Sequence, residues 1–471
     1  MILKLSSCLL VTGLLLAGVQ FQLQAQLVVN NANDSGIGSL RQAIADSSPG
    51  GTITFASGLS GATIVLTTGE LQVGKNLTID ASALADRVQI SGNTNSRIFN
   101  VTNCAVVMNS LTIRDGYIPL VYGQLYPNNA GGGILINQGT LTISNCLIVN
   151  NQAVQGTLAS GGGILNFFGT LTIHNSTISS NATIYYGGGI ENDSGTLTIY
   201  NSLISSNTAG IFGGGIDSYY GVVTINNSTL AGNSADTGGG GIENLGTLTL
   251  NQCTLTANSC SGSGGAAVDI SNGEVTINQS TLSGNAASDP DGVGGIWGDA
   301  TISNTIVAGN TAPTYSNLYG TITATGVNLT NGAPLLAPLG DYGGPTPTMM
   351  LISGSPAIDG CTMGTGFTTD QRGFPRVTGA YADIGAVEGF LNYNPVFFLT
   401  DVTKLGNGSI QFGFTNVSGL IFTVLATTNI AAPVNAWSNL GSPVESPPGR
   451  YQFTDSQAPN FPRRFYRVLL P

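Results

Sequence analysis

The sequence predicts an all-β protein: a right-handed parallel β-helix with end caps, followed by a small Ig-like β-sandwich. The first observation is a pentapeptide, Gly-Thr-Leu-Thr-Ile, that begins at Gly139, Gly169 and Gly195 and continues in variant form to Gly298 in steps of 25 to 30 residues. A Gly-Gly-Gly-Ile segment and a segment ending in Asn recur with the same period. Each unit of about 26 residues therefore holds three short strands separated by Gly or Asn turns.

Alternation within the pentapeptide gives each strand an inner and an outer face. Leu197 and Ile199 are expected to point inward and Thr198 outward, with Ile225 directly above Ile199. A unit this short cannot bury its apolar side chains alone, so the units must stack in parallel register. The recurrent Asn residues should supply turns and stack as hydrogen-bonded ladders. No window keeps a helical period, and the unit is shorter than a propeller blade.

We predict five segments along the chain of 471 residues. They are a signal peptide (1–25), an N-terminal cap with the first coils (26–100), the β-helix repeats (101–332), a C-terminal cap (333–389) and a small sandwich that could serve in sorting or retention (390–471). Lys4, the apolar run Leu9–Val19 and the small residue Ala25 are typical of an export signal. Ser39–Asp46 is the one amphipathic helix expected, and it would cover the first coil.

The charge distribution excludes several classes of partner. Between Arg114 and Arg372 the chain has no Lys or Arg but 14 Asp and Glu residues. Such a surface repels nucleic acid and anionic lipid, which bind through Lys and Arg. No segment after the signal peptide is long and apolar enough to span a bilayer, so we expect an exported monomer.

The five cysteines that would remain after export form no disulfide framework. Their number is odd and their spacing sparse. Cys146 and Cys253 occupy a repeat position that Ser fills in other units, which favours small buried side chains in a stacked row.

Three groups of motifs resemble exported bacterial β-helix proteins. Asn33-Asp34-Ser35-Gly36 with Gly38-Ser39-Leu40-Arg41-Gln42-Ala43-Ile44 resembles the opening segment of many such proteins, and the repeat is similar to that of the polymorphic outer membrane proteins. The set Tyr342–Thr346, Ser355–Gly360, Asp370–Gly373 and Asp383–Glu388 resembles the choice-of-anchor Q segment, with Met349 and Cys361 as departures. The resemblance covers residues 27 to 389 and implies architecture and export to the outer surface or exterior of a bacterium. It brings no catalytic residues.

The residues for most catalytic mechanisms are missing from the repeats. His174 is the only His of the chain and occupies a variable repeat position, so a surface role is expected. Without Lys or Arg, a lyase base is absent from the helix body, and nucleophile triads and His-based metal sites fail for lack of His. The Asp289-Pro290-Asp291-Gly292 turn is a weak calcium motif and is better interpreted as an ordinary turn.

The candidate site is a set of four carboxylates, Glu191, Asp217, Glu243 and Asp269, spaced 26 residues apart. In-register stacking would place them in a row with a spacing of ~4.8 Å on the outer face. The row is flanked by aromatic candidates for ligand binding: Phe168, Tyr186, Phe212, Tyr219 and Tyr220.

Three interpretations of this row follow from the residue types. It could be a solvated acidic stripe that aids solubility, a face that binds calcium or a glycan, or a retaining glycosidase pair, whose carboxyl groups lie ~5–5.5 Å apart. For calcium, Asn192, Ser218 and Asn244 would have to turn outward and add oxygen ligands.

We therefore predict an exported protein that binds a polysaccharide or a cell surface without catalysis. The alternative is a polysaccharide hydrolase that uses paired carboxylates. No organic cofactor is expected, and calcium is the one candidate ion.

Overall fold

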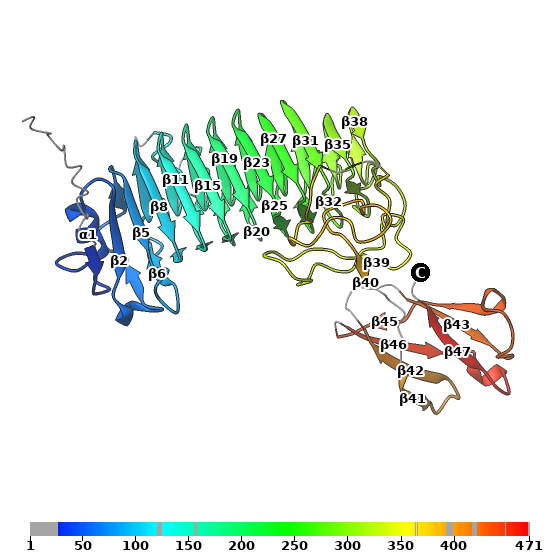
Figure 1. The fold of residues 1–471 in the computed structure, drawn as a ribbon. Coiled ribbons are helices and arrows are strands. Elements are labelled where there is room, and N and C mark those ends of the chain that lie inside the picture. Colours follow the sequence, from blue (N-terminus) through cyan, green and yellow to red (C-terminus); the bar gives the residue numbers. More distant parts are fainter. Residues whose placement is uncertain are drawn as a thin grey trace, which may run out of the picture.

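The chain forms a right-handed parallel β-helix with a small antiparallel sandwich at its C-terminal end (Figure 1). The computed structural model describes residues 27–119, 125–154, 158–362, 364, 366–391, 399–416, 422–447 and 449–469. The predicted signal peptide lies outside these residues. Within them, no helix has the length and apolar character needed to cross a membrane.

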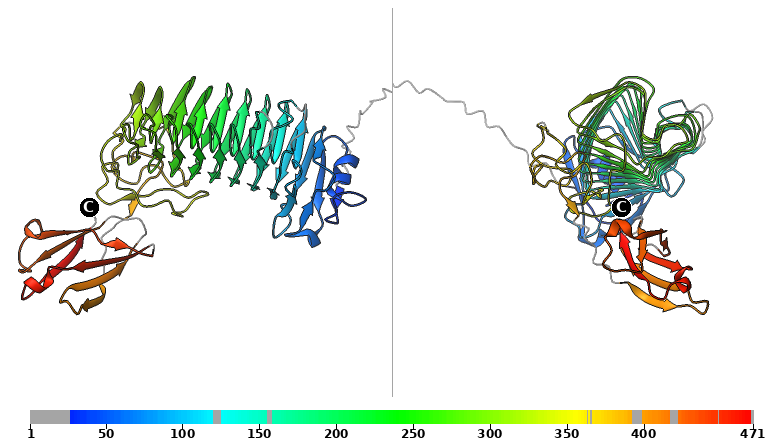
Figure 2. Two further views of the ribbon diagram at one scale, coloured as in Figure 1. Left: turned by 180° about the vertical axis from the view of Figure 1, so that it is seen from behind. Right: turned by 90° about the vertical axis from the view of Figure 1, so that its right-hand side faces the viewer.

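Three long parallel sheets run the length of the β-helix, and the coils superimpose when viewed along its axis (Figure 2). The first sheet contains β1 (Leu27–Val29), β2 (Gly51–Phe55), β5 (Leu77–Asp80), β8 (Ala105–Asn109), β11 (Thr140–Ser144), β15 (Thr170–His174), β19 (Thr196–Tyr200), β23 (Val222–Asn226), β27 (Thr247–Asn251), β31 (Glu274–Asn278), β35 (Ala300–Ser303) and β38 (Ile322–Thr325). The second contains β3 (Thr63–Val65), β6 (Val88–Ser91), β9 (Leu111–Arg114), β12 (Leu147–Val149), β16 (Thr177–Ser179), β20 (Leu203–Ser205), β24 (Thr229–Ala231), β28 (Thr254–Thr256), β32 (Thr281–Leu282) and β36 (Ile306–Val307).

The third sheet carries the candidate site. It contains β4 (Leu71–Val73), β7 (Phe99–Thr102), β10 (Ile134–Asn137), β14 (Ile164–Phe167), β18 (Ile190–Asp193), β22 (Ile216–Tyr219), β26 (Ile242–Asn244), β30 (Val268–Ile270), β34 (Ile296–Trp297) and β37 (Leu318–Tyr319). A fourth sheet of two-residue strands, which the sequence did not predict, lies between the second and third along the chain. Its strands are β13 (Gln152–Ala153), β17 (Ala182–Thr183), β21 (Thr208–Ala209), β25 (Ser234–Ala235), β29 (Ser259–Cys260) and β33 (Ala286–Ala287).

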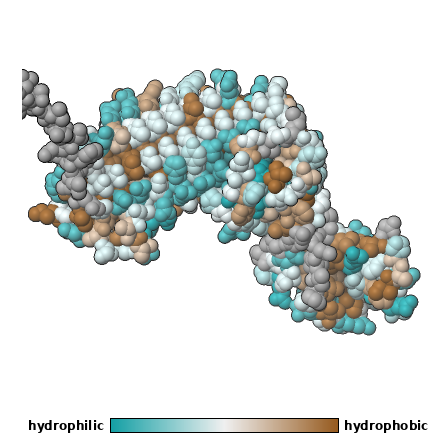
Figure 3. All heavy atoms as spheres, viewed as in Figure 1, coloured by the Kyte–Doolittle hydropathy of each residue, from teal (hydrophilic) through white to brown (hydrophobic). Residues whose placement is uncertain are grey.

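Register between coils follows the sequence repeat. Ile199 pairs with Ile173 on one side and with Ile225 on the other, and all three are buried in one continuous aliphatic core. The Thr residues that alternate with the inward side chains along each strand, such as Thr198 and Thr224, lie half-buried on the outer face. This face is mostly pale to hydrophilic in Figure 3, as rows of Thr predict. The five cysteines of the described residues are buried and free.

The predicted asparagine ladder is present. Asn181 Oδ1 accepts hydrogen bonds of 3.0 Å from both the backbone N–H and the side-chain amide of Asn151. The side-chain amide of Asn181 in turn donates to the Ile148 carbonyl and to Asn207. The pattern continues through Asn233, Asn258, Asn285 and Asn310. Each amide therefore bonds both to the next Asn and to a backbone carbonyl of the strand in the preceding coil.

The first coil is covered by helix α1 (Leu40–Asp46), as predicted. Ser39 caps the helix by accepting from the backbone N–H of Gln42, and Leu40 and Ile44 are buried. Arg41 donates to Asp34 and to the Gly69 and Glu70 carbonyls. Although burial raises the pKa of Asp34, hydrogen bonds from Thr68 and Arg41 hold it well below its usual value. The Asn-Asp-Ser-Gly motif thus fixes the helix to the β-helix end.

The segment 333–389 packs along the side of the last coils, which differs from the end cap that the sequence predicted. Gln371 contacts Ser228, Thr229 and Thr254, and Ala386 N–H donates to Thr281. Among the described residues, β37 and β38 are the last strands of their sheets. The segment instead contacts strands and turns of the preceding coils, from Ser228 to Thr281.

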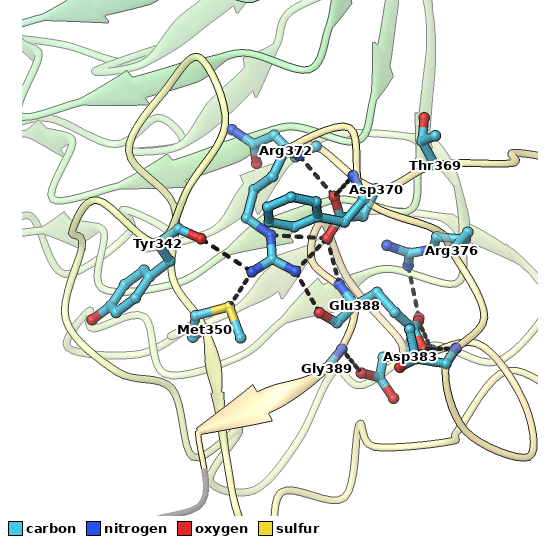
Figure 4. A network of polar contacts seen from close by, with 12 residues as sticks. Tyr342, Met350, Thr369, Asp370, Arg372, Arg376, Asp383, Glu388 and Gly389 are labelled. Atoms are coloured by element: carbon cyan, nitrogen blue, oxygen red, sulfur yellow. Dashed lines mark hydrogen bonds and ion pairs between the residues drawn. The ribbon is translucent and has the colours of Figure 1, made fainter.

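The choice-of-anchor-like residues of this segment form a structural network (Figure 4). Arg372 lies 2.6 Å from Asp370 and donates to the carbonyls of Glu388 and Tyr342. Asp383 Oδ2 accepts from the Gly389 N–H, and Arg376 donates to the Asp383 carbonyl. The motif therefore fixes loops that contain little regular structure.

The C-terminal sandwich consists of two antiparallel sheets. The strands are β41 (Thr400–Lys404), β42 (Ile410–Thr415), β46 (Arg450–Asp455) and β45 (Val444–Glu445), and β44 (Ser438–Gly441), β43 (Thr423–Thr427) and β47 (Phe465–Leu469). A two-stranded sheet, β39 (Leu351–Ile352) with β40 (Phe390–Leu391), precedes them. The core around Phe412 and Tyr451 is continuous with Met350 and Ile352 of the preceding segment.

The register predicts opposite effects for two adjacent substitutions. Ile225→Asp places an unpaired carboxylate in the aliphatic core and should destabilise the fold by more than about 4 kcal/mol. Thr224→Asp, on the outer face, should cost about 1 kcal/mol or less. Thermal unfolding followed by circular dichroism measures both, and equal damage from the two variants would contradict the strand assignment.

Candidate functional site

The four predicted carboxylates lie in one row, which we call the carboxylate row: Glu191, Asp217, Glu243 and Asp269. They pair in register on β18, β22, β26 and β30. The residue before each of them, from Ile190 to Val268, belongs to the aliphatic core. The predicted alignment and the outward direction relative to this core are therefore confirmed.

The interpretation of the row as a solvated stripe is wrong. All four side chains are buried, with exposed fractions between 1 and 3%. The cover is the chain that leads from the fourth sheet into the third. Gly213 (φ 67°) and Gly239 (φ 64°) lie so close that an added Cβ would come within 2.8 Å of Asp217 or Glu243. Gly suits this left-handed turn, because a side chain here would collide with the backbone and Cβ atoms of the acidic residue.

A cavity of about 390 Å³, which we call the flank cavity, opens over this row. Its floor is the outer face of the third sheet, where Asp193, Tyr219, Leu245 and Ser271 form a second row two residues beyond the carboxylates. The remaining lining residues come from turns and loops. The full lining is Tyr126, Leu158, Ser160, Tyr186, Glu191, Asp193, Phe212, Asp217, Tyr219, Glu243, Leu245 and Ser271.

Aromatic rings form one wall of the flank cavity. Tyr186 and Phe212 occupy equivalent positions in successive coils and stack with ring centroids 6.3 Å apart. The next two coils carry Gly238 and Gly264 here, and a Cβ on either would lie about 2 Å from an Asp269 carboxylate oxygen. The stack thus ends where the Asp269 side chain fills the space.

The structure brings six of the nine predicted residues to the cavity. Glu191, Asp217, Glu243, Tyr186, Phe212 and Tyr219 line it. Asp269 is in the row but outside the lining. Phe168 and Tyr220 are exposed beyond it, where each contacts the neighbouring aromatic residue.

Sequence reasoning missed Tyr126 and Asp193. The Tyr126 hydroxyl donates to Asp193 at 2.8 Å, and its ring lies edge-on to Phe167. Asp193 could have been found, because residues two apart on a strand share a face. Tyr126 lies in a loop that interrupts the repeat, so periodicity carries no information about its position.

Burial and mutual repulsion raise the pKa values along the row. Burial is the larger cause, and neighbouring carboxylates add to it, with Asp217 acting on Glu191 and Asp269 on Glu243. The pKa of Asp217 is raised to about 8 and that of Glu243 to about 10, while Glu191 is raised well above its usual value. Asp269 rises only to about 6, because hydrogen bonds from Glu243 and backbone groups stabilise its charge. These raised pKa values favour protonated carboxyl groups along the row, which lowers the repulsion between neighbours.

Several row oxygens lack hydrogen-bond partners in the described part of the chain. These are one carboxyl oxygen each of Glu191, Glu243 and Asp269. Asn192 cannot supply a further ligand here, because its oxygen accepts from Asn166 and its amide donates to the Gly195 carbonyl on the other face. No three His, Cys, Asp or Glu side chains among the described residues converge as a metal site.

The other polar candidates lie outside the cavity. His174 is half-buried at the end of β15 and stacks on Tyr200 at 5.0 Å. Asp289 accepts from the Asp291 N–H in an ordinary turn, as the sequence predicted.

Comparison with known proteins establishes the fold class alone. No protein-family model and no curated protein sequence matches the chain. A solved structure described as pectate lyase Pel9A is similar, with a TM-score of 0.51 and 14% identity over 77% of this chain and 96% of that chain. The chain is thus a right-handed parallel β-helix protein. Its distinguishing feature is the acidic, aromatic flank cavity.

The raised pKa values predict that stability falls as pH rises. Folded Asp217 and Glu243 keep protons that the unfolded chain releases above pH 3.8 and 4.5, respectively. The contribution of these two protons to the free energy of unfolding is complete below pH 3.8 and 4.5, respectively. It is lost as pH rises through the folded-state pKa of about 8 for Asp217 and of about 10 for Glu243. The melting temperature should therefore fall between pH 6.5 and 8.5, above the pKa of about 6 of Asp269.

The control for this prediction is Asp217→Asn with Glu243→Gln, which keeps the side-chain shapes and removes both titrations. Its melting temperature should change much less across the same range. A wild-type melting temperature that rises or stays constant would contradict the protonated row.

Proposed function

We propose that this chain is an exported, surface-associated or secreted protein that binds glycans in the flank cavity without cutting them, in the service of adhesion. The observation that carries the proposal is the pairing of Tyr186 and Phe212 with a floor of carboxyl groups. Sugar rings combine an apolar face with a polar edge, and recognition sites for such ligands are concave, with aromatic surface and a few fixed polar groups. The resemblance to exported bacterial β-helix proteins supports the location.

The architecture also supports a ligand of some length. The lining runs over five successive coils, from Ser160 to Ser271. At ~4.8 Å per coil this corresponds to roughly 19 Å along the axis. A chain of sugars laid along the axis fits this length better than a single small molecule does.

A glycoside hydrolase is the second candidate, because neighbouring carboxylates of the row have the strand spacing of ~4.8 Å, close to the ~5–5.5 Å of a retaining pair. Such a pair needs one protonated and one ionised carboxyl group. Along the cavity floor the pKa values of Glu191, Asp217 and Glu243 are all raised above neutrality or well above their usual values. Asp269, with its lower pKa, lies outside the lining. The protonation pattern therefore favours binding.

A glycan array tests the proposal, with matched aromatic variants. Tyr186→Ala with Phe212→Ala should weaken binding at least about tenfold, because truncating a contact aromatic typically costs more than 1 kcal/mol. Phe168→Ala is the control, since that ring is exposed outside the cavity. Equal binding by the wild type and both variants would show that glycans do not bind in the flank cavity. New reducing ends after incubation with the bound glycans would instead favour the hydrolase.

Calcium binding by the carboxylate row stays a prediction. A cation that binds only the folded protein raises the melting temperature, and ionised carboxylates are its preferred ligands. At pH 8, millimolar calcium should raise the melting temperature of the wild type but not of Asp217→Asn with Glu243→Gln. An unmoved wild-type melting curve would exclude the ion.

A further inference from the structure

The carboxyl groups of the flank cavity are incompletely hydrogen-bonded. Glu191 and Glu243 are at least 97% buried, and each has one side-chain oxygen without a partner among the described residues. Both side chains line the cavity. A buried polar atom left unpaired costs free energy, so native proteins generally provide a partner. A ligand that donates hydrogen bonds would supply it.

No Lys or Arg is among the described residues that line the flank cavity. No Lys or Arg occurs between Arg114 and Arg372, a range that contains every lining residue. Arg97 reaches the carbonyls of Asn128 and Ala130, close in sequence to Tyr126, but its guanidinium is paired with Glu70 at 2.7 Å. A positive charge in the cavity must therefore come from the ligand.

The aromatic wall of the flank cavity also favours a ligand with a positive charge. Tyr186 and Phe212 are half-buried and stacked, and Tyr219 is 45% exposed on the floor. Ammonium groups are attracted to aromatic faces as well as to carboxylates. The carboxyl groups and the aromatic wall of the flank cavity thus both favour a positively charged ligand group.

We propose that the flank cavity binds glycans built from amino sugars with free, protonated amino groups, which donate to Glu191, Asp217 and Glu243 while the sugar rings lie against Tyr186 and Phe212. This assignment rests on the proposed glycan-binding function and names its ligand class. A bound ammonium group lowers the pKa of the adjacent carboxyl groups and pairs with the carboxylate that forms as the proton leaves to solvent, whereas the carboxylates of a polyuronate would raise that pKa further and find no cation between the two sets of groups. N-acetylation removes the positive charge and should weaken binding.

Calorimetric titration of the full mature chain with three tetrasaccharides tests the ligand class. The probes are glucosamine, N-acetylglucosamine and galacturonate oligomers, at about pH 5.5, which keeps a sugar amine protonated although the adjacent C–O bonds lower its pKa below that of a lysine amine. The glucosamine oligomer should bind at least about tenfold more tightly than the other two. Asp217→Asn with Glu243→Gln should abolish that preference, while Glu274→Gln, an exposed carboxyl group on the first sheet, should keep it.

The outcomes separate this inference from the proposed function. Tighter binding of the N-acetylated or uronate oligomer overturns the amino-sugar assignment and leaves glycan binding in place. No binding of any glycan, here or on the array, overturns both. Tighter binding of tetralysine than of tetraglucosamine would show that the site recognises cationic peptides and would also overturn the assignment. Melting curves of each variant verify the fold before titration.

Discussion

Parallel in-register hydrogen bonding between coils is the constraint on which the rest of this structure depends. Because each strand pairs with its counterpart one repeat away, every side chain is stacked on its equivalent in the next coil. Apolar positions become a continuous core, and Asn positions become a ladder in which each amide satisfies its neighbour. The same rule applies where stacking is unfavourable, so a single acidic position in the repeat becomes a row of like charges on the third sheet.

No Lys or Arg among the lining residues offsets this row, and burial together with mutual repulsion raises the pKa values of its carboxyl groups. Replacing the row with apolar residues would remove the cost, as the preceding coils show, where Leu135 and Leu165 occupy the same position. The acidic residues begin at Glu191 and end with Asp269, which Trp297 follows, and three of the four line the flank cavity. A local departure from the packing rules that coincides with a cavity is typical of a functional site.

The repeat period was sufficient to predict the coils, the core residues, the Asn ladder and the alignment of the carboxylate row, because all four follow from stacking alone. It could not predict the burial of the row. That depends on how the chain entering each strand folds over the acidic residue, as at Gly213, whose left-handed turn lies against Asp217. This Gly recurs with the repeat, but the contact that it makes is three-dimensional and does not follow from the period. The lateral path of residues 333–389 was missed for a similar reason, since Gln371 reaches coils more than 100 residues earlier in the chain.

Fold and ligand preference have separate physical origins here. The backbone that resembles pectate lyase Pel9A is held by aliphatic stacking and amide ladders, which place no condition on the charge of the outer face. The electrostatic character of the flank cavity comes from one position in four successive coils and from the absence of Lys and Arg in the surrounding sequence. A β-helix can therefore keep its stacking while the side chains of one outer row set the charge of the ligand. In this chain the buried carboxyl groups of that row favour a cationic partner over an anionic one.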